Sequence, residues 1–494
     1  MSHKRNVTLR GKKRGSSVKK IDKPGRKKCS ADHGAELKEL FRWLLPKRIF
    51  LKRRVHGNTK WKSASLVWMA VCWAWCEAKN VTDAFTHSAE WMDSLNRSSV
   101  PKTYQGFIRA LTAAGDELVS LVRSCIHKRL PQIGRSFWRY RGRVLFAFDG
   151  SRETVARTRS NEAAFCAKNY GHGKTAKYRR KKTKGMRRRK NEKNKPQPQE
   201  PQIWLTMIWQ VTLRIPWTWR LGPSDSGERA HVLDMLKEEE FPEKSLFCGD
   251  AGFVGYSFWS ALVKKGHDFL VRVGGNVRLL SEVAAIHRIG DNIVYSWPKD
   301  AERKNLPPLR LRLVKIRFKD NSIWMLTSVL SSRELSKRDI KAIYKKRWGV
   351  EVEFRGLKQT LGRRKLRCRN PERAKTELSW RILAMAVAEL FALKEQLCAS
   401  NASDTDDLPS RRSLAETMRA LRFALRHLHR RLQTAGLRKR LQTAVTDRYI
   451  RRVPKDARYR PPNPDKNRLG EPALKQLNPK QRRKIRQTAN QNSA

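Results

Sequence analysis

The stretch YKKRWGVEVEFRGLK, from Tyr344 to Lys358, combines a helical rhythm with residues that can do chemistry. At about 100° per residue, a helix places Tyr344, Arg347 and Lys358 within roughly 40° of Glu351. Apolar residues gather on a neighbouring face, as packing against a core requires; they are Ile343, Val350, Phe354, Leu357 and Leu361. Glu353 falls away from both faces, at about 200°. An acid, two cations and a phenol in one stripe suit a metal ion and phosphate groups.

Two further carboxylates follow short apolar runs. RVLFAFDG predicts a buried strand with Asp149 at its carboxyl end, and SLFCGDAGF predicts another strand that ends at Asp250. Taken alone, each aspartate also fits an ordinary turn, because Asp-Gly is a common turn element. Carboxylate oxygens are ligands that Mg²⁺ prefers, and two such ions about 4 Å apart can stabilise both oxygens exchanged in phosphoryl transfer. The pattern therefore makes Asp149, Asp250 and Glu351 candidate metal ligands.

The net charge of the chain indicates what kind of molecule it binds. The 494 residues include 109 Lys and Arg against 45 Asp and Glu, which gives a net charge of +64. Such an excess predicts a polyanion, and nucleic acid fits better than a membrane because the charge is spread along the whole chain. The most apolar run, SLVWMAVCWAWCEA, is shorter than the about 18 residues of a membrane span, so it predicts a buried helix, with an interfacial helix as the alternative. The 8 scattered cysteines predict a reducing compartment.

The apolar rhythm divides the chain into parts. Strand, acid, crossover, strand and acid in succession indicate an α/β core. Within it, the basic loop 171–200 is too polar to pack, and its cluster Arg187, Arg188, Arg189 and Lys190 is either solvated or tracks phosphates. The predicted parts are a basic flexible arm (1–34), an all-α amino-terminal domain expected to bind DNA (35–135), the core in two pieces (136–275 and 336–398), a β-rich insertion (276–335) and a helical, basic carboxyl-terminal region (399–494).

Four residue types at three fixed spacings carry a family resemblance. Tyr344, Arg347, Glu351 and Lys358 fit the signature Y-(2)-R-(3)-E-(6)-K of DDE transposases in the insertion-sequence family four. The segments FDGS and CGDAGF resemble the two aspartate motifs of that family, in the same order. The resemblance covers about residues 140 to 395 and does not reach the amino-terminal helices or the basic tails.

The resemblance implies a fold and a site. The core would be a ribonuclease H-like fold interrupted by a β-rich insertion, on which the three acids come together as catalytic residues and bind Mg²⁺ or Mn²⁺, as two ions. Tyr344, Arg347 and Lys358 would contact DNA phosphates near the cut. Related enzymes hold a flipped base on an aromatic residue of the insertion, for which Trp297 and Trp324 are candidates, the alternative being half-buried strand residues.

The resemblance also implies a function. It predicts an enzyme that binds the inverted-repeat ends of an insertion sequence, cuts the strands with water and joins the freed 3′ ends to target DNA. Its partners would be double-stranded DNA and a second copy in a synaptic homodimer, in the cytoplasm at the nucleoid and without a membrane. A catalytically inactive, transposase-derived DNA-binding protein is the alternative, against which the three intact acids argue. A stand-alone metal nuclease is a third possibility, but it has no use for the additional helical and basic regions.

Overall fold

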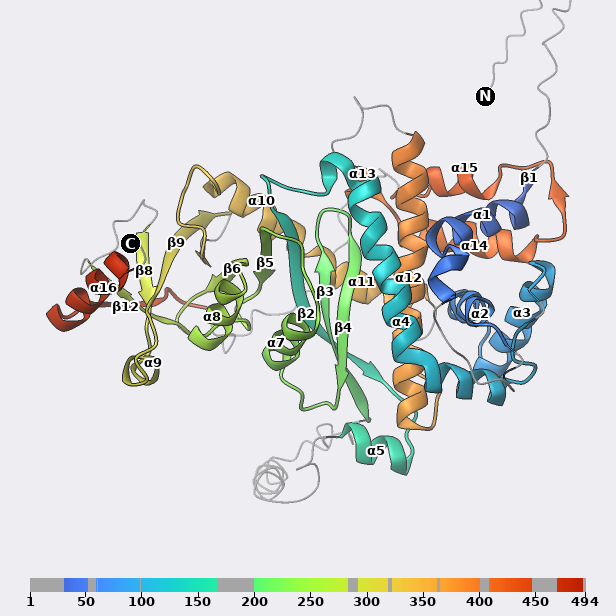
Figure 1. Cartoon of the computed structure of the whole chain (residues 1–494), viewed down its shortest axis with the longest axis horizontal. Coiled ribbons are helices and arrows are strands. Elements are labelled where there is room, and N and C mark those ends of the chain that lie inside the picture. The colour runs from blue at the N-terminus through green and yellow to red at the C-terminus, as the bar shows by residue number, and fades with distance from the viewer. Residues whose placement is uncertain are drawn as a thin grey trace, which may run out of the picture.

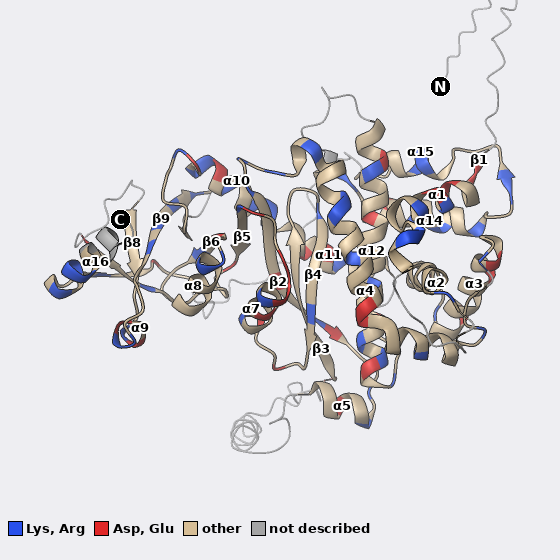
Figure 2. Ribbon diagram, in the orientation of Figure 1, with Lys and Arg blue, Asp and Glu red and all other residues tan. Residues whose placement is uncertain are grey.

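The structure, a computed structural model, describes residues 31–51, 59, 61–97, 99–166, 200–282, 292–318, 322–361, 365–399, 408–446 and 469–491. A mixed sheet occupies one side of an elongated molecule and a body of helices occupies the other (Figure 1). One core of buried apolar side chains runs through both parts. Lys and Arg lie along both the sheet and the helical body (Figure 2). The basic cluster at 187–190 lies outside the described residues.

Ten strands form the main sheet, in the order β12-β7-β8-β9-β10-β6-β5-β2-β3-β4. Their bounds are β2 Val144–Thr154, β3 Gln202–Gln210, β4 Ile215–Gly222, β5 Ser245–Gly249, β6 Asp268–Val273, β7 Arg278–Ser281, β8 Asn292–Ser296, β9 Leu309–Arg317, β10 Ser322–Thr327 and β12 Ala473–Gln476. The pairs β2/β5, β5/β6 and β12/β7 are parallel, and the other neighbours are antiparallel. The short strands β1 (Ala31–Asp32) and β11 (Arg431–Leu432) pair separately.

Helices cover this sheet and build the second part of the molecule. Their bounds are α1 His33–Leu44, α2 Ser63–Trp75, α3 Val81–Ser94, α4 Tyr104–Gly134, α5 Arg159–Phe165, α7 Glu228–Glu238, α8 Tyr256–Lys264, α9 Lys299–Arg303, α10 Lys337–Arg347, α11 Gly349–Arg355, α12 Pro371–Ala399, α13 Leu408–Arg411, α14 Leu414–Arg426, α15 Leu437–Gln442 and α16 Pro479–Gln491; short 3₁₀ helices span Lys47–Phe50 and Arg135–Phe137. The long helix α12 packs against α2, α4, α14 and α15 and also against β4, so it joins the helical body to the sheet.

The apolar run from the amino-terminal part forms the buried helix α2, as predicted. Its side chains are buried on every face, which is the pattern of a core helix rather than of one lying at an interface. The Trp75 indole donates a hydrogen bond to the Ala384 carbonyl on α12 (2.8 Å), which satisfies its buried N–H. Cys72 and Cys76 are both buried. In the described part of the chain, no helix is long and apolar enough to cross a membrane.

Two local predictions near the candidate acids are wrong. β2 does not end at Asp149 but continues to Thr154, because β3 pairs with it along this whole length. The predicted uninterrupted helix from Tyr344 to Lys358 is divided into α10, α11 and a π-helical turn at Gly356–Thr360. The angles of an ideal helix therefore agree with the contact between Arg347 and Glu351, but they do not give the position of Lys358.

The structure places the strands of the predicted insertion and part of the carboxyl-terminal region in the main sheet. The β-rich segment continues the core sheet, because β10 pairs with β6 on one side and with β9 on the other. Residues 469–491 contribute a strand as well as a helix: β12 extends the sheet beside β7, and α16 packs next to it (Figure 1). Leu477 and Ile485 from this segment enter a small second core with Tyr256, Tyr295, Trp297 and Ala301.

Candidate active site

The register of two parallel strands brings Asp149 and Asp250 together. β2 and β5 pair with a constant offset of 101 residues, beginning with Val144 opposite Ser245. The same 101 residues separate Asp149 from Asp250, which directly follows β5. Because paired strands lie about 4.8 Å apart, the two aspartates stand at the same level on neighbouring strands. The structure therefore brings these two predicted site residues together on neighbouring interior strands of the sheet.

The segments α10 and α11 carry the third acid to the same place. α10 packs against β5 and α11 against β2. Gly349 permits this approach, because a Cβ atom there would lie 2.1 Å from the indole of Trp209 on β3. Arg347 Nη1 is 3.6 Å from Asp149 Oδ2, and its Nη2 is 3.2 Å from Glu351 Oε1. The Arg347 side chain is only 6% exposed, so it is a buried cation between two acids.

The electrostatics show that the three acids act on one another. Burial is the main reason that the pKa of Asp149 is raised to about 6. A hydrogen bond from the Gly150 amide to Asp149 Oδ1 (2.8 Å) and the charge of Arg347 lower this pKa, while the charges of Asp250 and Glu351 raise it. Ionising Asp149 is therefore unfavourable unless further positive charge lies nearby.

The donor atoms of these three side chains are of the type that a divalent cation prefers. All three offer hard carboxylate oxygens, and the Arg347 guanidinium shows that positive charge is accommodated between Asp149 and Glu351. Within the described ranges, no group of three or more His, Cys, Asp or Glu side chains lies close enough together to hold an ion. A cation bound here would compete with Arg347 for Asp149 and Glu351.

Lys358, predicted on the same stripe as Glu351, reaches farther along β2. Its Nζ donates a hydrogen bond to Ser151 Oγ (2.8 Å) and lies 3.5 Å from Glu153 Oε1. Glu153 is buried; its burial raises the pKa of this carboxyl, and the charge of Lys358 lowers it. In this structure Lys358 is thus the ion-pair partner of a buried acid, two to four residues beyond Asp149.

The aromatic residues near the predicted stripe differ in exposure. The Arg347 guanidinium lies over the ring of Tyr344, 5.6 Å from its centre, and Tyr344 is partly buried. Trp348, which the sequence analysis did not single out, is 57% exposed between α10 and α11. Trp297 and Trp324 are both buried, and the Trp297 indole donates to the Leu306 carbonyl (2.9 Å). This burial favours the strand interpretation of Trp297 and Trp324 over a base-holding role.

Glu353 belongs to another cluster. Its helical angle separates it from Glu351, but the angle gave no sign that Glu353 is only 2% exposed. Burial raises the pKa of Glu353, and burial together with the charge of Glu353 raises the pKa of Glu389 on α12. Arg412 Nη2 lies 3.9 Å from Glu389 Oε1 and donates to the Leu213 carbonyl (2.9 Å). Glu353 is therefore part of a buried ionic cluster behind the site.

Glu228 is a fourth acid near the two aspartates, and sequence reasoning missed it. It is the first residue of α7, and its burial, followed by the charges of Asp149 and Asp250, raises its pKa to about 7. No apolar run precedes Glu228, so the strand-then-acid pattern could not find it. The glycine after Asp149 was the only signal, because Gly150 leaves the space that the Glu228 carboxyl fills.

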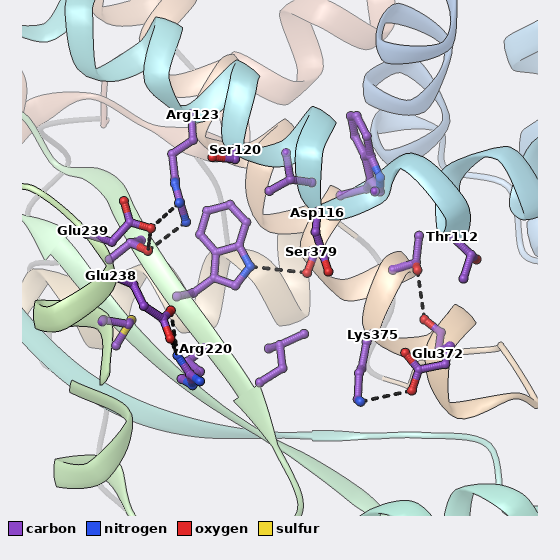
Figure 3. A pocket seen from close by; sticks show the side chains of 18 residues that line it. Thr112, Asp116, Ser120, Arg123, Arg220, Glu238, Glu239, Glu372, Lys375 and Ser379 are labelled. Atoms are coloured by element: carbon purple, nitrogen blue, oxygen red, sulfur yellow. Dashed lines mark hydrogen bonds and ion pairs between the residues drawn. The ribbon is translucent and has the colours of Figure 1, made fainter. Parts of the chain in front are cut away.

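A pocket of about 450 Å³ lies elsewhere, among α4, β4, α7 and α12 (Figure 3). None of the three predicted acids lines it. Its cations pair with acids of its own walls: Arg123 with Glu239, Arg220 with Glu238 and Lys375 with Glu372. Because these charges satisfy one another, the pocket is not the candidate active site.

One family model and one solved structure are similar to this chain. Residues 145–387 match the family model described as the transposase DDE domain, and this segment contains Asp149, Asp250 and Glu351. The match supports a DDE transposase, a class of DNA-processing polynucleotidyl transferases that generally use divalent metals. A cryo-EM structure of the piggyBac transposase synaptic complex with hairpin DNA is similar, with a TM-score of 0.40 and 12% identity over 85% of this chain and 87% of that chain. No curated protein sequence matches the chain.

Proposed function

We propose that the chain is a DDE transposase of the insertion-sequence family four, which binds the inverted-repeat ends of its element and cuts and joins DNA strands. In this proposal β2 to β6 and their helices form a ribonuclease H-like core. The observation that carries it is the shared position of the three acids: Asp149 and Asp250 in register on parallel strands, and Glu351 joined to Asp149 through Arg347.

The proposed chemistry is phosphoryl transfer with Mg²⁺ or Mn²⁺, as two ions. Asp149, Asp250 and Glu351 are assigned as the metal ligands and catalytic residues. Divalent cations held there stabilise the attacking and leaving oxygens of the phosphate. Burial supports this assignment, because a carboxylate with a raised pKa gains most from a bound cation.

The proposed DNA contacts come from the same elements. Arg347 can form a fork of hydrogen bonds to a phosphate when it leaves the acids, and Lys358 and Tyr344 add a point charge and a hydroxyl donor. The exposed indole of Trp348 can stack on an unpaired base. The basic cluster 187–190 would track the backbone of double-stranded DNA. A homodimer that holds two ends, associated with the nucleoid, completes the proposal.

The decisive experiment uses purified protein, Mg²⁺ and DNA that carries the element's ends. We expect the wild type to cut and join these ends, and we expect Asp149→Asn or Glu351→Gln to abolish cleavage while binding stays nearly intact. Each substitution removes a carboxylate without removing positive charge, so the attraction to DNA is retained. Binding is measured by gel shift and cleavage on labelled ends.

The same experiment separates the alternatives. Binding without cleavage by the wild type would identify an inactive DNA-binding derivative. Cleavage without strand joining would indicate a nuclease. Equal loss of binding and cleavage in both variants would show that Asp149 and Glu351 are structural, and the proposed active site would then be wrong.

A further inference from the structure

A groove of about 360 Å³ lies between α14 and α15, which pack side by side in the helical body (Figure 1). Three arginines line it: Arg419 and Arg426 from α14, and Arg440 from α15. Among the described residues that line the groove, Glu416 is the one acid, and it pairs with Arg419. The charges of Arg426 and Arg440 are therefore not balanced by an acid of the groove.

The guanidinium groups of Arg426 and Arg440 are held by contacts that leave their outer nitrogens available. Arg440 lies over the ring of Phe423, 3.8 Å from its centre, and its Nε donates to the Ala435 carbonyl (3.0 Å). Arg426 Nε donates to the Arg422 carbonyl (3.3 Å). Within the described part of the chain, no hydrogen bond or ion pair engages the Nη atoms of these two arginines. Each thus presents a pair of N–H donors, the fork that binds a phosphate through two hydrogen bonds.

The ordinary explanations for these arginines account for only part of the arrangement. Exposed arginines are often simply solvated, and the stacking of Arg440 also covers the ring of Phe423. On α14, however, Arg426 follows the buried Arg422 by four residues, a spacing at which like charges destabilise a helix. Arg440 adds its charge to the same groove. A bound anion would offset the repulsion among these cations.

The shape of the groove favours the backbone of double-stranded DNA as this anion. Base edges lie inside the DNA grooves, and a protein reads them with an element that protrudes, such as a helix. The arginines here line a hollow between two helices, which fits the raised sugar-phosphate backbone instead. The net charge of +64 and the match to the transposase DDE domain both favour DNA over other polyanions.

Another face of α14 supports the candidate active site. Leu414 packs against Gly356, where an added Cβ atom would lie 2.6 Å from Leu414 Cδ2. Gly356 begins the π-helical turn that carries Lys358. At the end of this turn, the Thr360 carbonyl accepts a hydrogen bond from Arg422 (3.1 Å). DNA in the groove would therefore lie against the same helix that holds this turn in place.

We propose that the groove between α14 and α15 binds the phosphate backbone of double-stranded DNA through Arg426 and Arg440. This inference rests on the proposed function, because it adds a DNA contact to the same enzyme. It assigns a binding role to the basic carboxyl-terminal region, which lies beyond the family resemblance at about residues 140 to 395.

The test measures binding of the full chain to duplex DNA by fluorescence anisotropy at several salt concentrations. One duplex carries the element's ends and the other has an unrelated sequence. Arg426→Gln combined with Arg440→Gln should lower the affinity for both duplexes on the order of tenfold, because phosphate contacts carry no sequence information. The slope of log K against log salt should become shallower by about 1.8, at about 0.9 for each lost contact.

Lys304→Gln combined with Arg310→Gln is the matched control. It removes the same charge from two exposed residues on the sheet side of the molecule, so it should bind both duplexes like the wild type. An equal loss in the control would show that only net charge matters, and an unchanged slope in the groove variant would also overturn the inference. A loss confined to the end duplex would indicate base readout, against a backbone contact.

A second variant separates a held guanidinium from diffuse positive charge. Arg440→Lys keeps the charge but removes the planar fork that stacks on Phe423. We expect the affinity for both duplexes to fall about two- to fivefold, with the salt slope unchanged. Wild-type affinity in this variant would show that the groove attracts DNA only through its net charge, against the proposed contact.

Cleavage of the end duplex with Mg²⁺ separates failure of this inference from failure of the proposed function. A wild type that neither binds nor cuts this duplex would contradict the proposed function. A wild type that binds and cuts, with a groove variant that binds DNA equally well, would contradict only the inference. If that variant loses affinity for poly-glutamate and not for DNA, the groove binds an acidic protein and the inference is overturned. Thermal melting of each variant confirms that the fold is retained.

Discussion

At the scale of single residues, the surroundings of Asp149 disfavour its ionised form. Its pKa is raised to about 6 from an ordinary value of 3.8, with burial as the main cause. Between these pH values the folded state binds a proton that the unfolded state has lost. The free energy of unfolding therefore falls as the pH rises from about 4 to 6, and the full penalty remains above about 6.

This penalty predicts that Asp149→Asn stabilises the protein at neutral pH. Asparagine cannot ionise, so in EDTA at pH 7.5 the variant should gain on the order of 2 kcal/mol in the free energy of unfolding. At pH 3 the gain should nearly vanish, because the wild-type carboxyl is then protonated in both the folded and the unfolded state. Denaturant unfolding at both pH values measures the difference. If the variant is less stable than the wild type at pH 7.5, the ionised Asp149 does not destabilise the folded protein, and this prediction is wrong.

Lys358 gives a second prediction at this scale. Since Lys358 is the partner of the buried Glu153, Lys358→Ala should lower stability by about 1 to 3 kcal/mol, because it leaves a buried acid without its ion pair. Adding Glu153→Gln should recover most of this stability. If Lys358 also contacts DNA, the stable double variant will still cut slowly. Full recovery of cleavage would assign Lys358 to the fold alone.

At the scale of elements, the approach of α11 to the sheet decides where Glu351 lies. Gly349→Ala would place a Cβ atom 2.1 Å from the buried Trp209 ring, which is part of a packed core and cannot easily move. We expect lower stability, by about 1 to 3 kcal/mol, and a strong loss of cleavage although every acid is retained. Gly115→Ala on α4 is the control, because a Cβ there meets nothing within 4 Å. Equal behaviour of the two variants would show that the close packing of α11 is unimportant.

The elements also show how far the sequence can predict this site. Short apolar runs before Asp149 and Asp250 predict strands, and the parallel register then brings both acids together, because their separation equals the strand offset. Glu351 follows from the helical rhythm and the spacing of its neighbours. Glu228 could not be predicted, since its position depends on how α7 packs on β2. The burial of Glu353 could not be predicted either, since this carboxyl is buried near Arg214 and Arg412, distant residues whose approach no local pattern encodes.

At the scale of the whole molecule, the net charge of +64 should govern binding to DNA. Neutralising Arg187, Arg188, Arg189 and Lys190 to Gln should weaken DNA binding with little effect on folding. For every phosphate that the cluster no longer neutralises, the slope of log K against log salt should become shallower by about 0.9. Binding isotherms at several salt concentrations measure the slope, with thermal melting as the control for folding. An unchanged slope would mean that this cluster is only solvated.

The strand β12 is synthesised long after the strand with which it pairs, β7. Ala473 pairs with Arg278, so one edge of β7 has no partner until the ribosome has made another 195 residues. At about 5 to 20 residues per second, a ribosome needs roughly 10 to 40 seconds to make the intervening chain. During that time the edge of β7 presents unpaired N–H and C=O groups, and Tyr295 and Trp297 lack Leu477 and Ile485 as a cover. During this interval the exposed edge of β7 in the nascent chain could pair with other strands. The exposure ends when β12 pairs with β7.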